Sequence, residues 1–500
     1  MDAGVETGAV ISLSIYFAGM LWIGVYAWRK STADVSGYLL GGRRLSPSVA
    51  ALSAGAADMS GWLMMGLPGA AFLSGLSASW IAIGLFAGAL ANYLIVAPRL
   101  RVHTEETGDA ITIPAYFAQR LDDRSHVLRL VCALVIVIFF TLYTSAGMVA
   151  GGKLFETAFG ADYTLGLWIT AGAVLIYTLI GGFLAVSLTD FVQGIIMFVA
   201  LVMVPVVAFF AIDGDVVAQV VAINPTAMDL FAGTTALGII SSLAWGLGYF
   251  GQPHIITRFM AVRSVKDIPT MRNIGMTWMA VSLIGALATG FVGLAYANAN
   301  GIVVNDAETI FILLGQILFH PMITGFLYAA LLAAIMSTIS SQLLVSSSSL
   351  VEDFYRVFLR REVADKELVT VGRASVLAVS LAAIALAWSP ENTILGLVAD
   401  AWAGFGAAFG PLVILSLTWR RLTVAGALAG VIVGAVTVVL CILPLMPDGQ
   451  SFSVAVVYAM VPGFFLSFAA AILVSLASRP SPLALERYDE GERALAAARA

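Results

Sequence analysis

Charged side chains and cysteines are scarce in this sequence. Asp, Glu, Lys and Arg make up 11% of the 500 residues, whereas hydrophobic residues make up 60%. The two cysteines, Cys132 and Cys441, both fall in apolar stretches, which excludes a disulfide framework, a CxxC motif and a Cys/His metal site. With a mean hydropathy of +0.97, this composition excludes a soluble protein and predicts an all-α integral membrane protein.

Apolar runs of spanning length predict about thirteen transmembrane helices within a single membrane domain, 1–500. Between them, the segment 111–120 has Pro114 early and is expected to form a short helix along the membrane interface. The polar, alanine-rich tail 479–500 is expected to be disordered or weakly helical. The predicted spans are 5–28, 47–72, 78–98, 128–155, 163–185, 190–213, 233–260, 274–297, 321–351, 370–388, 393–418, 423–446 and 452–477.

The distribution of Lys and Arg predicts how the chain sits in the membrane. All but one of the 25 basic residues fall in alternate connections and in the tail, and the exception is Lys153. We expect a multi-pass protein of the cytoplasmic (inner) membrane. Because basic loops stay cytoplasmic, its amino terminus should lie outside the cell and its carboxyl terminus in the cytoplasm. This orientation requires an odd number of spans. The first span has Asp2 and Glu6 where a signal peptide would be basic, so we interpret it as a retained helix.

Two of the predicted spans contain residues that interrupt helices. Span 47–72 reads SAGAADMSGW and then GLPG, and span 233–260 reads WGLGYFGQP. Interrupted backbone at membrane depth must be buried in protein or face a water-filled cavity. Two such spans at corresponding positions of two halves indicate the midplane binding site of an inverted-repeat transporter. The alternative is that both are kinked packing helices, because glycine is common in membrane spans.

The spacing of the two interrupted spans predicts the organisation of the domain. Each would open a five-helix repeat, 47–213 and 233–418, and an odd number of helices inverts the second copy. The sequence therefore predicts a LeuT-type 5+5 inverted-repeat core with broken helices. The remaining segments are an extra helix at 5–28, two carboxyl-terminal helices at 423–477 and the cytoplasmic tail 479–500.

Polar side chains within the spans are candidates for a site. Asp58 is the one carboxylate near the middle of the first broken span, where it costs at least roughly 2.5–3.5 kcal/mol. A bound cation or nearby donors would offset this cost, and a structural capping role is the alternative. Two roles stay open for Asp400: a residue of the transport pathway, or a locally solvated structural group. The hydroxyls of Ser337 and Thr338 offer neutral oxygens to a small monovalent cation, although such hydroxyls can also bond to the preceding turn.

Aromatic residues flank the second interruption. Trp245 and Tyr249 lie four residues apart, so they share one helical face. This placement indicates a wall around the apolar part of a small solute.

Several long strings of residues closely resemble the sodium/proline branch of the solute:sodium symporter family, over about residues 8 to 475. The resemblance implies a sodium-coupled secondary active symporter that imports L-proline by alternating access, and it implies no enzymatic activity. It further implies co-transported sodium, a lipid bilayer around the chain, and neither a nucleic-acid partner nor an obligatory protein partner. The strings are LSAGAADMSGWLMMGLPGA (52–70), YTLIGGFLAVSLTD (177–190), AWGLGYFGQPH (244–254), AAIMSTISSQLLV (333–345), WAGFGAAFGP (402–411) and WRRLTVAGALAG (419–430).

The same resemblance implies roles for particular residues. It implies a sodium site formed by the carbonyls of Ala56, Met59 and Ala334 and by the hydroxyls of Ser337 and Thr338. It implies a solute pocket formed by Ser60, Trp62, Gly66, Tyr143, Trp245, Tyr249, Gln252 and Pro253. Charged residues that influence coupling would be Asp58, Arg43 and Asp190.

Three positions depart from the family's pattern, and two alternative functions stay open. Ala57, Ser341 and Asp400 stand where the relative has a serine, a cysteine and a tyrosine. Asp400 adds a charge within a span and leaves open a change in coupling or solute release. The alternatives are a sodium- or proton-coupled importer of another small solute and a transporter-like sensor.

Overall fold

The computed structural model describes residues 3–30, 35–359, 364–388, 393–447 and 449–499, and they are almost entirely helical. A single isolated parallel bridge joins Leu45 and Val262 in these ranges. The α-helices are α1 (Ala3–Lys30), α2 (Val35–Leu40), α3 (Pro47–Asp58), α4 (Leu67–Ser74), α5 (Ser79–Ile95), α6 (Ala97–Glu106), α7 (Ile113–Leu121), α8 (Val127–Phe159), α9 (Tyr163–Phe210), α10 (Val216–Ile223), α11 (Ala236–Leu243), α12 (Pro253–Ala261), α13 (Ile268–Ala299), α14 (Ile310–Leu318), α15 (Pro321–Ser348), α16 (Asp365–Leu386), α17 (Ile394–Thr418), α18 (Val424–Ile442), α19 (Phe452–Ala455), α20 (Met460–Ala477) and α21 (Pro482–Arg499). Short 3₁₀ or π segments are η1 (Gly41–Arg43), η2 (Trp62–Gly66), η3 (Gly75–Ala78), η4 (Ala244–Gly251), η5 (Val265–Asp267), η6 (Ala307–Thr309) and η7 (Ser349–Leu359).

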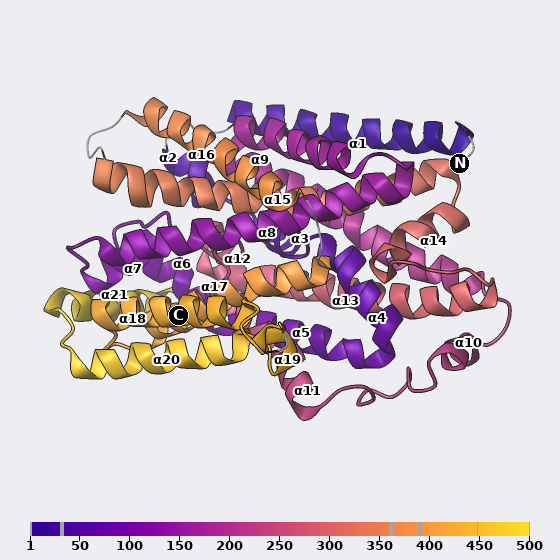
Figure 1. The fold of residues 1–500 in the computed structure, drawn as a ribbon. Helices are drawn as coiled ribbons and strands as arrows, with labels where there is room; N and C mark the ends of the chain where they lie inside the picture. Colours follow the sequence, from indigo (N-terminus) through magenta and orange to yellow (C-terminus); the bar gives the residue numbers. More distant parts are fainter. Residues whose placement is uncertain (1–2, 31–34, 360–363, 389–392, 448, 500) are drawn as a thin grey trace.

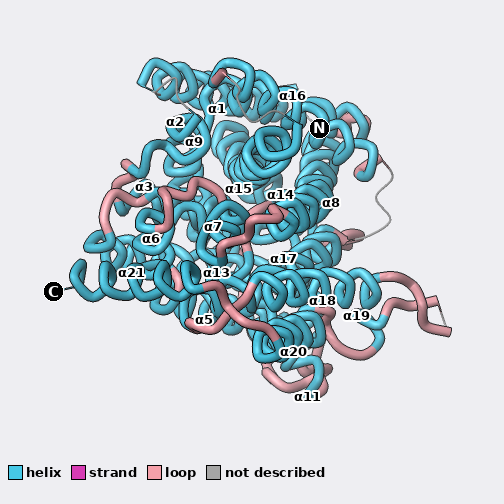
Figure 2. The backbone as a smooth tube through the Cα atoms, turned by 90° about the vertical axis from the view of Figure 1, so that its left-hand side faces the viewer, coloured by secondary structure: helices cyan, strands magenta, loops and turns pink. Residues whose placement is uncertain are grey.

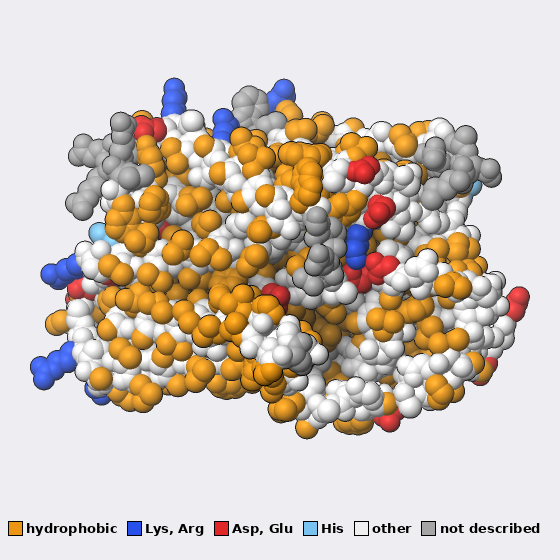
Figure 3. Space-filling view, viewed as in Figure 1, with side chains coloured by type: hydrophobic (Ala, Val, Ile, Leu, Met, Phe, Trp, Pro, Cys, Tyr) orange, Lys and Arg blue, Asp and Glu red, His pale blue; other side chains and the backbone are white. Residues whose placement is uncertain are grey.

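The long helices run roughly along one axis, which is horizontal in Figure 1. Seen from the end, α15 lies among α1, α8, α9 and α14 (Figure 2), and it packs against all four. In the space-filling view the flank is mostly hydrophobic, and Lys and Arg gather toward the end where α7, α18 and α21 lie (Figure 3). An apolar flank with a basic end is the arrangement that a bilayer requires.

Ten helices of the described residues are long and apolar enough to cross a membrane. Three shorter apolar helices, Tyr163–Ile176, Ala236–Gly251 and Ala307–Leu318, fall below that length. The first two of these lie within predicted spans, so the number thirteen stays a prediction. The two predicted spans at 163–185 and 190–213 form one continuous element, α9, which turns sharply at Gly182 (φ 59°, ψ −159°). Tyr38 of α2 packs there, and a Cβ on this glycine would lie 2.6 Å from its ring.

The first broken helix is interrupted between α3 and η2. α3 ends at Asp58, and Met59 leaves the helical conformation (φ −82°, ψ 74°) before the π turn η2 begins at Trp62. Gly61 lies against α8, because a Cβ there would be 2.8 Å from the Cβ of Ala150. The interruption that was predicted from glycine and polar residues is therefore present, and it leaves backbone groups unpaired at the centre of the fold.

The second broken helix runs from α11 through the 3₁₀ segment η4 to α12. Gln252 is extended (φ −84°, ψ 103°), and Pro253 starts α12 at a position where its missing N–H is not needed. The glycines of η4 permit close packing: a Cβ on Gly248 would lie 1.9 Å from Nε1 of Trp402 in α17. Side chains at these positions would separate η4 from α5 and α17.

The basic end of the molecule is more ordered than the sequence suggests. The short helix that was predicted at 111–120 is α7, and the hydroxyl of Thr112 accepts a hydrogen bond from the amide of Ala115 at its start (3.1 Å). Of the two expectations for the tail, disordered or weakly helical, the structure has the helical one, because 482–499 forms the helix α21. Arg420 holds this helix through two contacts to Asp489 (2.8 and 2.7 Å). Partners this distant in sequence cannot be recognised from the composition of the tail alone.

Candidate functional site

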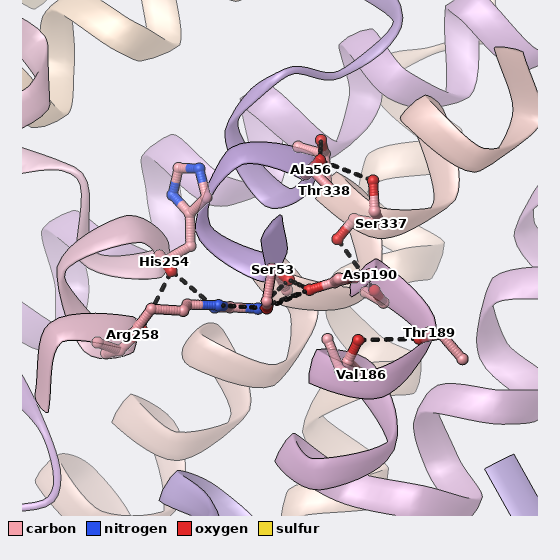
Figure 4. Close-up of polar contacts among 12 residues, drawn as sticks. Ser53, Ala56, Val186, Thr189, Asp190, His254, Arg258, Ser337 and Thr338 are labelled. Carbon is pink, nitrogen blue, oxygen red and sulfur yellow. Dashed lines mark hydrogen bonds and ion pairs between the residues drawn. The ribbon is translucent and has the colours of Figure 1, made fainter. Parts of the chain in front are cut away.

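Hydroxyl groups of α15 meet a carbonyl near the end of α3 and a carbonyl of α15 itself. Ser337 Oγ donates to the carbonyls of Ala56 (2.7 Å) and Ala334 (3.2 Å). Thr338 Oγ1 contacts the same two oxygens at 3.4 and 3.2 Å, and Figure 4 shows both hydroxyls beside Ala56. Met59, the fifth predicted ligand, lies buried three residues beyond Ala56, where α3 ends. The structure thus gathers four neutral oxygens, which we call the oxygen cluster, in the type of set that a small monovalent cation requires.

Asp58 follows Ala56 by two residues in α3 and is only 3% exposed. The hydroxyl of Tyr249 donates to its Oδ2. Its backbone carbonyl accepts from Trp62 Nε1 (3.2 Å) and from the Tyr143 hydroxyl (3.4 Å). The second carboxylate oxygen, Oδ1, is buried without a hydrogen-bond partner in the described part of the chain. Asp58 therefore joins the second broken helix through its carboxylate and α8 through its backbone carbonyl.

Aromatic side chains form a wall next to Asp58. The ring of Trp245 lies 6.2 Å from that of Trp62 and 6.5 Å from that of Trp402. Tyr249 meets Trp402 edge to face at 5.2 Å, an arrangement that aromatic pairs favour. The indole of Trp402 also donates to the carbonyl of Trp245 (2.8 Å). The sequence analysis assigned no role to Trp402, because a tryptophan in an apolar span gives no signal that separates a pocket from packing.

The other predicted solute residues are buried around the same wall. Gln252 Nε2 donates to the carbonyl of Trp402 (3.2 Å), and the Ser60 hydroxyl accepts from the amide of Trp62 (3.5 Å). Gly66 faces α17, where a Cβ would lie 3.1 Å from that of Leu395. All eight predicted solute residues come from the α3–η2 break, η2, α8, η4 and α12, and all are buried: Ser60, Trp62, Gly66, Tyr143, Trp245, Tyr249, Gln252 and Pro253.

Asp190 belongs to a fully buried ion pair. Arg258 Nη2 contacts Asp190 Oδ2 at 3.1 Å, and neither side chain is exposed. The same guanidinium donates to the Ser53 hydroxyl (3.0 Å), the Ser341 hydroxyl (2.5 Å) and the carbonyl of His254 (2.6 Å). These contacts join α3, α9, α12 and α15 (Figure 4).

Arg258 is buried more deeply than the sequence analysis indicated. Counting basic residues grouped it with those around the connection after span 233–260, and the structure buries its side chain completely. Its position five residues after Pro253, within an apolar stretch, is the signal that could have identified it. Ser53 precedes Ala56 by three residues and Ser341 follows Thr338 by three, so the ion pair lies about one helical turn from the oxygen cluster.

Arg43 lies apart from these groups. Its guanidinium contacts Asp109 (2.8 Å) and the carbonyls of Met260 (2.9 Å) and Ala110 (2.8 Å). Burial lowers the pKa of the Arg43 guanidinium, and Asp109 partly opposes this shift. Arg43 therefore ties η1 to the α6–α7 connection and to the end of α12, without touching the oxygen cluster. Asp400, which departs from the family pattern, is partly exposed on α17.

Two discontinuous helices around a cluster of neutral oxygens, in an all-helical membrane chain, define a LeuT-type transporter fold. The structure of a Na⁺-coupled sialic acid symporter in a substrate-bound, outward-open state superposes with a TM-score of 0.79, covering 95% of this chain and 98% of that one. The two sequences are 20% identical, so this likeness concerns the fold.

Residues 38–434 match the sequence model of the sodium:solute symporter family, and the chain belongs to that family. It is 55% identical to the osmoregulated proline transporter of Bacillus subtilis (strain 168), over 97% of this chain and 98% of the relative. It is 57% identical to the high-affinity proline transporter of the same organism, over 94% and 98%. Sodium/proline symporter 2 of Staphylococcus saprophyticus is 54% identical, over 93% of this chain and 92% of the relative.

Proposed function

We propose that the chain is a sodium-coupled secondary active symporter that imports L-proline across the cytoplasmic membrane by alternating access. The observation that carries this proposal is the oxygen cluster at the end of α3, in a chain whose relatives are named proline transporters and sodium/proline symporters. Sodium is carried as cargo together with the solute.

The oxygen cluster supplies the sodium site in this proposal. Without an ion, the hydroxyls of Ser337 and Thr338 donate to the carbonyls of Ala56 and Ala334. When sodium enters, each hydroxyl turns its hydrogen away and presents a lone pair, so that the four oxygens face the ion. Met59 would complete the set with its carbonyl. Sodium then holds the end of α3 against α15 and orders the break.

The solute binds next to the ion, against the aromatic wall. The pyrrolidine ring packs on Trp245 and Tyr249, while the carboxylate meets free amides near Ser60 and Gly61 at the positive end of a half-helix. Because sodium orders this same backbone, sodium raises the affinity for proline, and proline raises the affinity for sodium by the same factor. One sodium ion that enters down roughly 100 mV contributes about 2.3 kcal/mol to accumulation.

Alternating access requires the buried contacts to rearrange around this site. We propose that the broken helices move as a unit against α8, α9, α15 and α16. The Asp190–Arg258 pair and the Arg43 contacts lie between the oxygen cluster and the basic end of the molecule, so they would open when ions and solute leave toward the cytoplasm. The two repeats 47–213 and 233–418, thirteen spans, an outside amino terminus and a cytoplasmic carboxyl terminus are part of the same proposal.

Uptake into proteoliposomes tests the proposed function. Labelled L-proline is offered under an inward sodium gradient and, in parallel, under an equal choline gradient at fixed pH and voltage. We expect accumulation with sodium alone. Uptake under the choline gradient would contradict sodium coupling. No proline uptake under either gradient would reject the solute and direct attention to other small solutes and to the Asp400 departure.

A further inference from the structure

We propose that the groove between α5 and α13 binds an anionic phospholipid, whose phosphate lies between Lys266 and Arg272 at the basic end of the molecule. The two helices pack against each other (Figure 2), and both belong to segments that are long and apolar enough to cross a membrane. This inference goes beyond the proposed function, because it depends neither on the solute nor on the coupling ion. It rests on two cavities that open along the groove.

The first cavity lies at the end of α5 and the start of α13. Its volume is about 480 Å³, and its walls combine two basic side chains, Lys266 and Arg272, with apolar residues that include Leu94 and Ile268. The helix α21 contributes Ala498 to one side. Among the residues that the structure describes, no carboxylate lines this cavity. Positive charge beside an apolar wall at the membrane interface suits a lipid phosphate.

The basic side chains of this cavity differ from a neighbour that already has a partner. Arg263, in the same connection, pairs with Asp267 at 2.6 Å. Lys266 and Arg272 form no ion pair with any residue that the structure describes. The guanidinium of Arg272 donates instead to the uncharged side-chain oxygen of Asn273 (3.1 and 2.9 Å). A phosphate accepts hydrogen bonds from both basic groups and supplies the missing negative charge.

A second cavity continues the groove toward the middle of the membrane. Its volume is about 370 Å³, and apart from Ser79 it is lined by apolar residues of α5 and α13. Ile83 precedes Leu94 by eleven residues on α5, and Leu283 follows Arg272 by eleven residues on α13. Eleven residues make about three helical turns, so the two cavities open on the same face of both helices.

The distance between the cavities matches one leaflet of a bilayer. Arg272 is the one charged residue of α13. At a rise of about 1.5 Å per residue, Ile284 in the second cavity lies roughly 18 Å further along the helix. Half of the hydrocarbon core is roughly 15 Å thick. An acyl chain attached at the phosphate therefore reaches the second cavity, which a free phosphate ion would leave unfilled.

The unfolding temperature of the purified full-length protein in a neutral detergent tests this site, because a ligand of the folded state raises it. The ligands titrated are dioleoyl phosphatidylglycerol, dioleoyl phosphatidylcholine and inorganic phosphate. Lys266→Gln/Arg272→Gln removes both charges, and Ala87→Phe places a ring in the second cavity without changing charge. Arg29→Gln/Arg124→Gln is the matched control, because it removes two charges that are exposed outside both cavities. Gel filtration and cooperative unfolding show that each variant is folded.

We expect the wild type to bind phosphatidylglycerol at least about tenfold more tightly than phosphatidylcholine, with no effect of inorganic phosphate at the same concentration. Lys266→Gln/Arg272→Gln should lose this preference, and Arg29→Gln/Arg124→Gln should keep it. Ala87→Phe should weaken both lipids by a similar factor. No preference in the wild type, full preference in Lys266→Gln/Arg272→Gln, or unchanged lipid binding in Ala87→Phe would overturn the site. Equal stabilisation by inorganic phosphate and phosphatidylglycerol would overturn the lipid and leave a free anion as the occupant.

Discussion

Asp58 and Asp190 are the same residue type, both are buried, and both are tied to α3, yet the protein treats them in opposite ways. Asp190 has an arginine and two serine hydroxyls around one oxygen, contributed by three other helices. Asp58 has a single tyrosine hydroxyl on one oxygen. In both carboxylates the other oxygen, Oδ1, is buried without a hydrogen-bond partner among the described residues. Asp190 holds helices together through these contacts, whereas Asp58 forms no ion pair with a basic side chain among the described residues, which fits the coupling role that the resemblance implies for it.

The largest expected effect comes from breaking the buried pair. Arg258→Met leaves Asp190 ionised and unpaired, which should destabilise the protein by about 3–5 kcal/mol. Thermal unfolding of the purified protein measures this as a lower transition temperature. The double variant Arg258→Met/Asp190→Leu should recover most of the loss, because it removes both charges. A double variant no more stable than the single one would show that the pair is not the reason for the loss.

A smaller effect is expected at Asp58. Tyr249→Phe removes the hydroxyl that donates to this carboxylate, and hydrogen bonds to charged groups contribute about 1.5–3 kcal/mol. The unfolding temperature should therefore fall, although less than in Arg258→Met, and proline affinity at saturating sodium should fall about 10-fold or more because the same residue lines the solute pocket. Tyr163→Phe is the matched control, because it removes a hydroxyl that donates to Ala387 (2.8 Å), far from the site in the chain. Equal losses in both variants would contradict a specific role of Tyr249.

The comparison of buried titratable groups extends to His103 at the basic end of the molecule. Its Nε2 lies 3.2 Å from a carboxylate oxygen of Glu492. Burial lowers the pKa of His103 to about 4, although Glu492 opposes the shift. Because the folded pKa lies below the ordinary value of about 6.5, the unfolded chain takes up the proton first as the pH falls. Stability is therefore complete above pH 6.5 and is lost between about 6.5 and 4.

At pH 5 this loss should amount to about 1–2 kcal/mol. Unfolding temperatures measured from pH 7.5 to pH 5 check this expectation. His103→Gln should remove the part of the pH dependence that arises from this side chain. If the unfolding temperature of His103→Gln depends on pH as steeply as that of the wild type, other titratable groups cause the pH dependence.

The smallest effect is expected for the exposed pair of Arg420 and Asp489, which lies on the surface near the middle of α21. Solvent screens such pairs, so Arg420→Ala should shift the unfolding temperature less than any variant above. Limited proteolysis of α21 is the more sensitive measurement, and the exchanged pair Arg420→Asp/Asp489→Arg should restore protection. A large global destabilisation by Arg420→Ala would mean that the stability lost on removing a charged side chain does not increase with its burial.

Much of the fold follows from local sequence, because helix breaks have local causes. Glycine, proline and polar residues around Asp58 and Tyr249 predicted both interruptions, and the structure contains both. The positions of Ser337 and Thr338 beside Ala56 also agree with the expected oxygen cluster. The ion that they bind remains a proposal.

Other features depend on partners that are remote in sequence. Arg258 meets Asp190 across 68 positions, and His103 meets Glu492 across 389. Counting basic residues gave no sign that Arg258 is buried, and composition alone suggested a disordered or weakly helical tail. In both cases the structure depends on burial against a specific partner side chain, and that partner cannot be identified from a single sequence.

The most direct measurement of the central claim is proline affinity as a function of sodium concentration, in the wild type and in Ser337→Ala/Thr338→Ala. In the wild type, the dissociation constant for proline should fall as sodium rises, because the ion orders the end of α3. In the double variant this dependence should disappear or move to at least tenfold higher sodium, while the protein remains folded. A double variant with the sodium dependence of the wild type would contradict the assignment of the oxygen cluster as the coupling site.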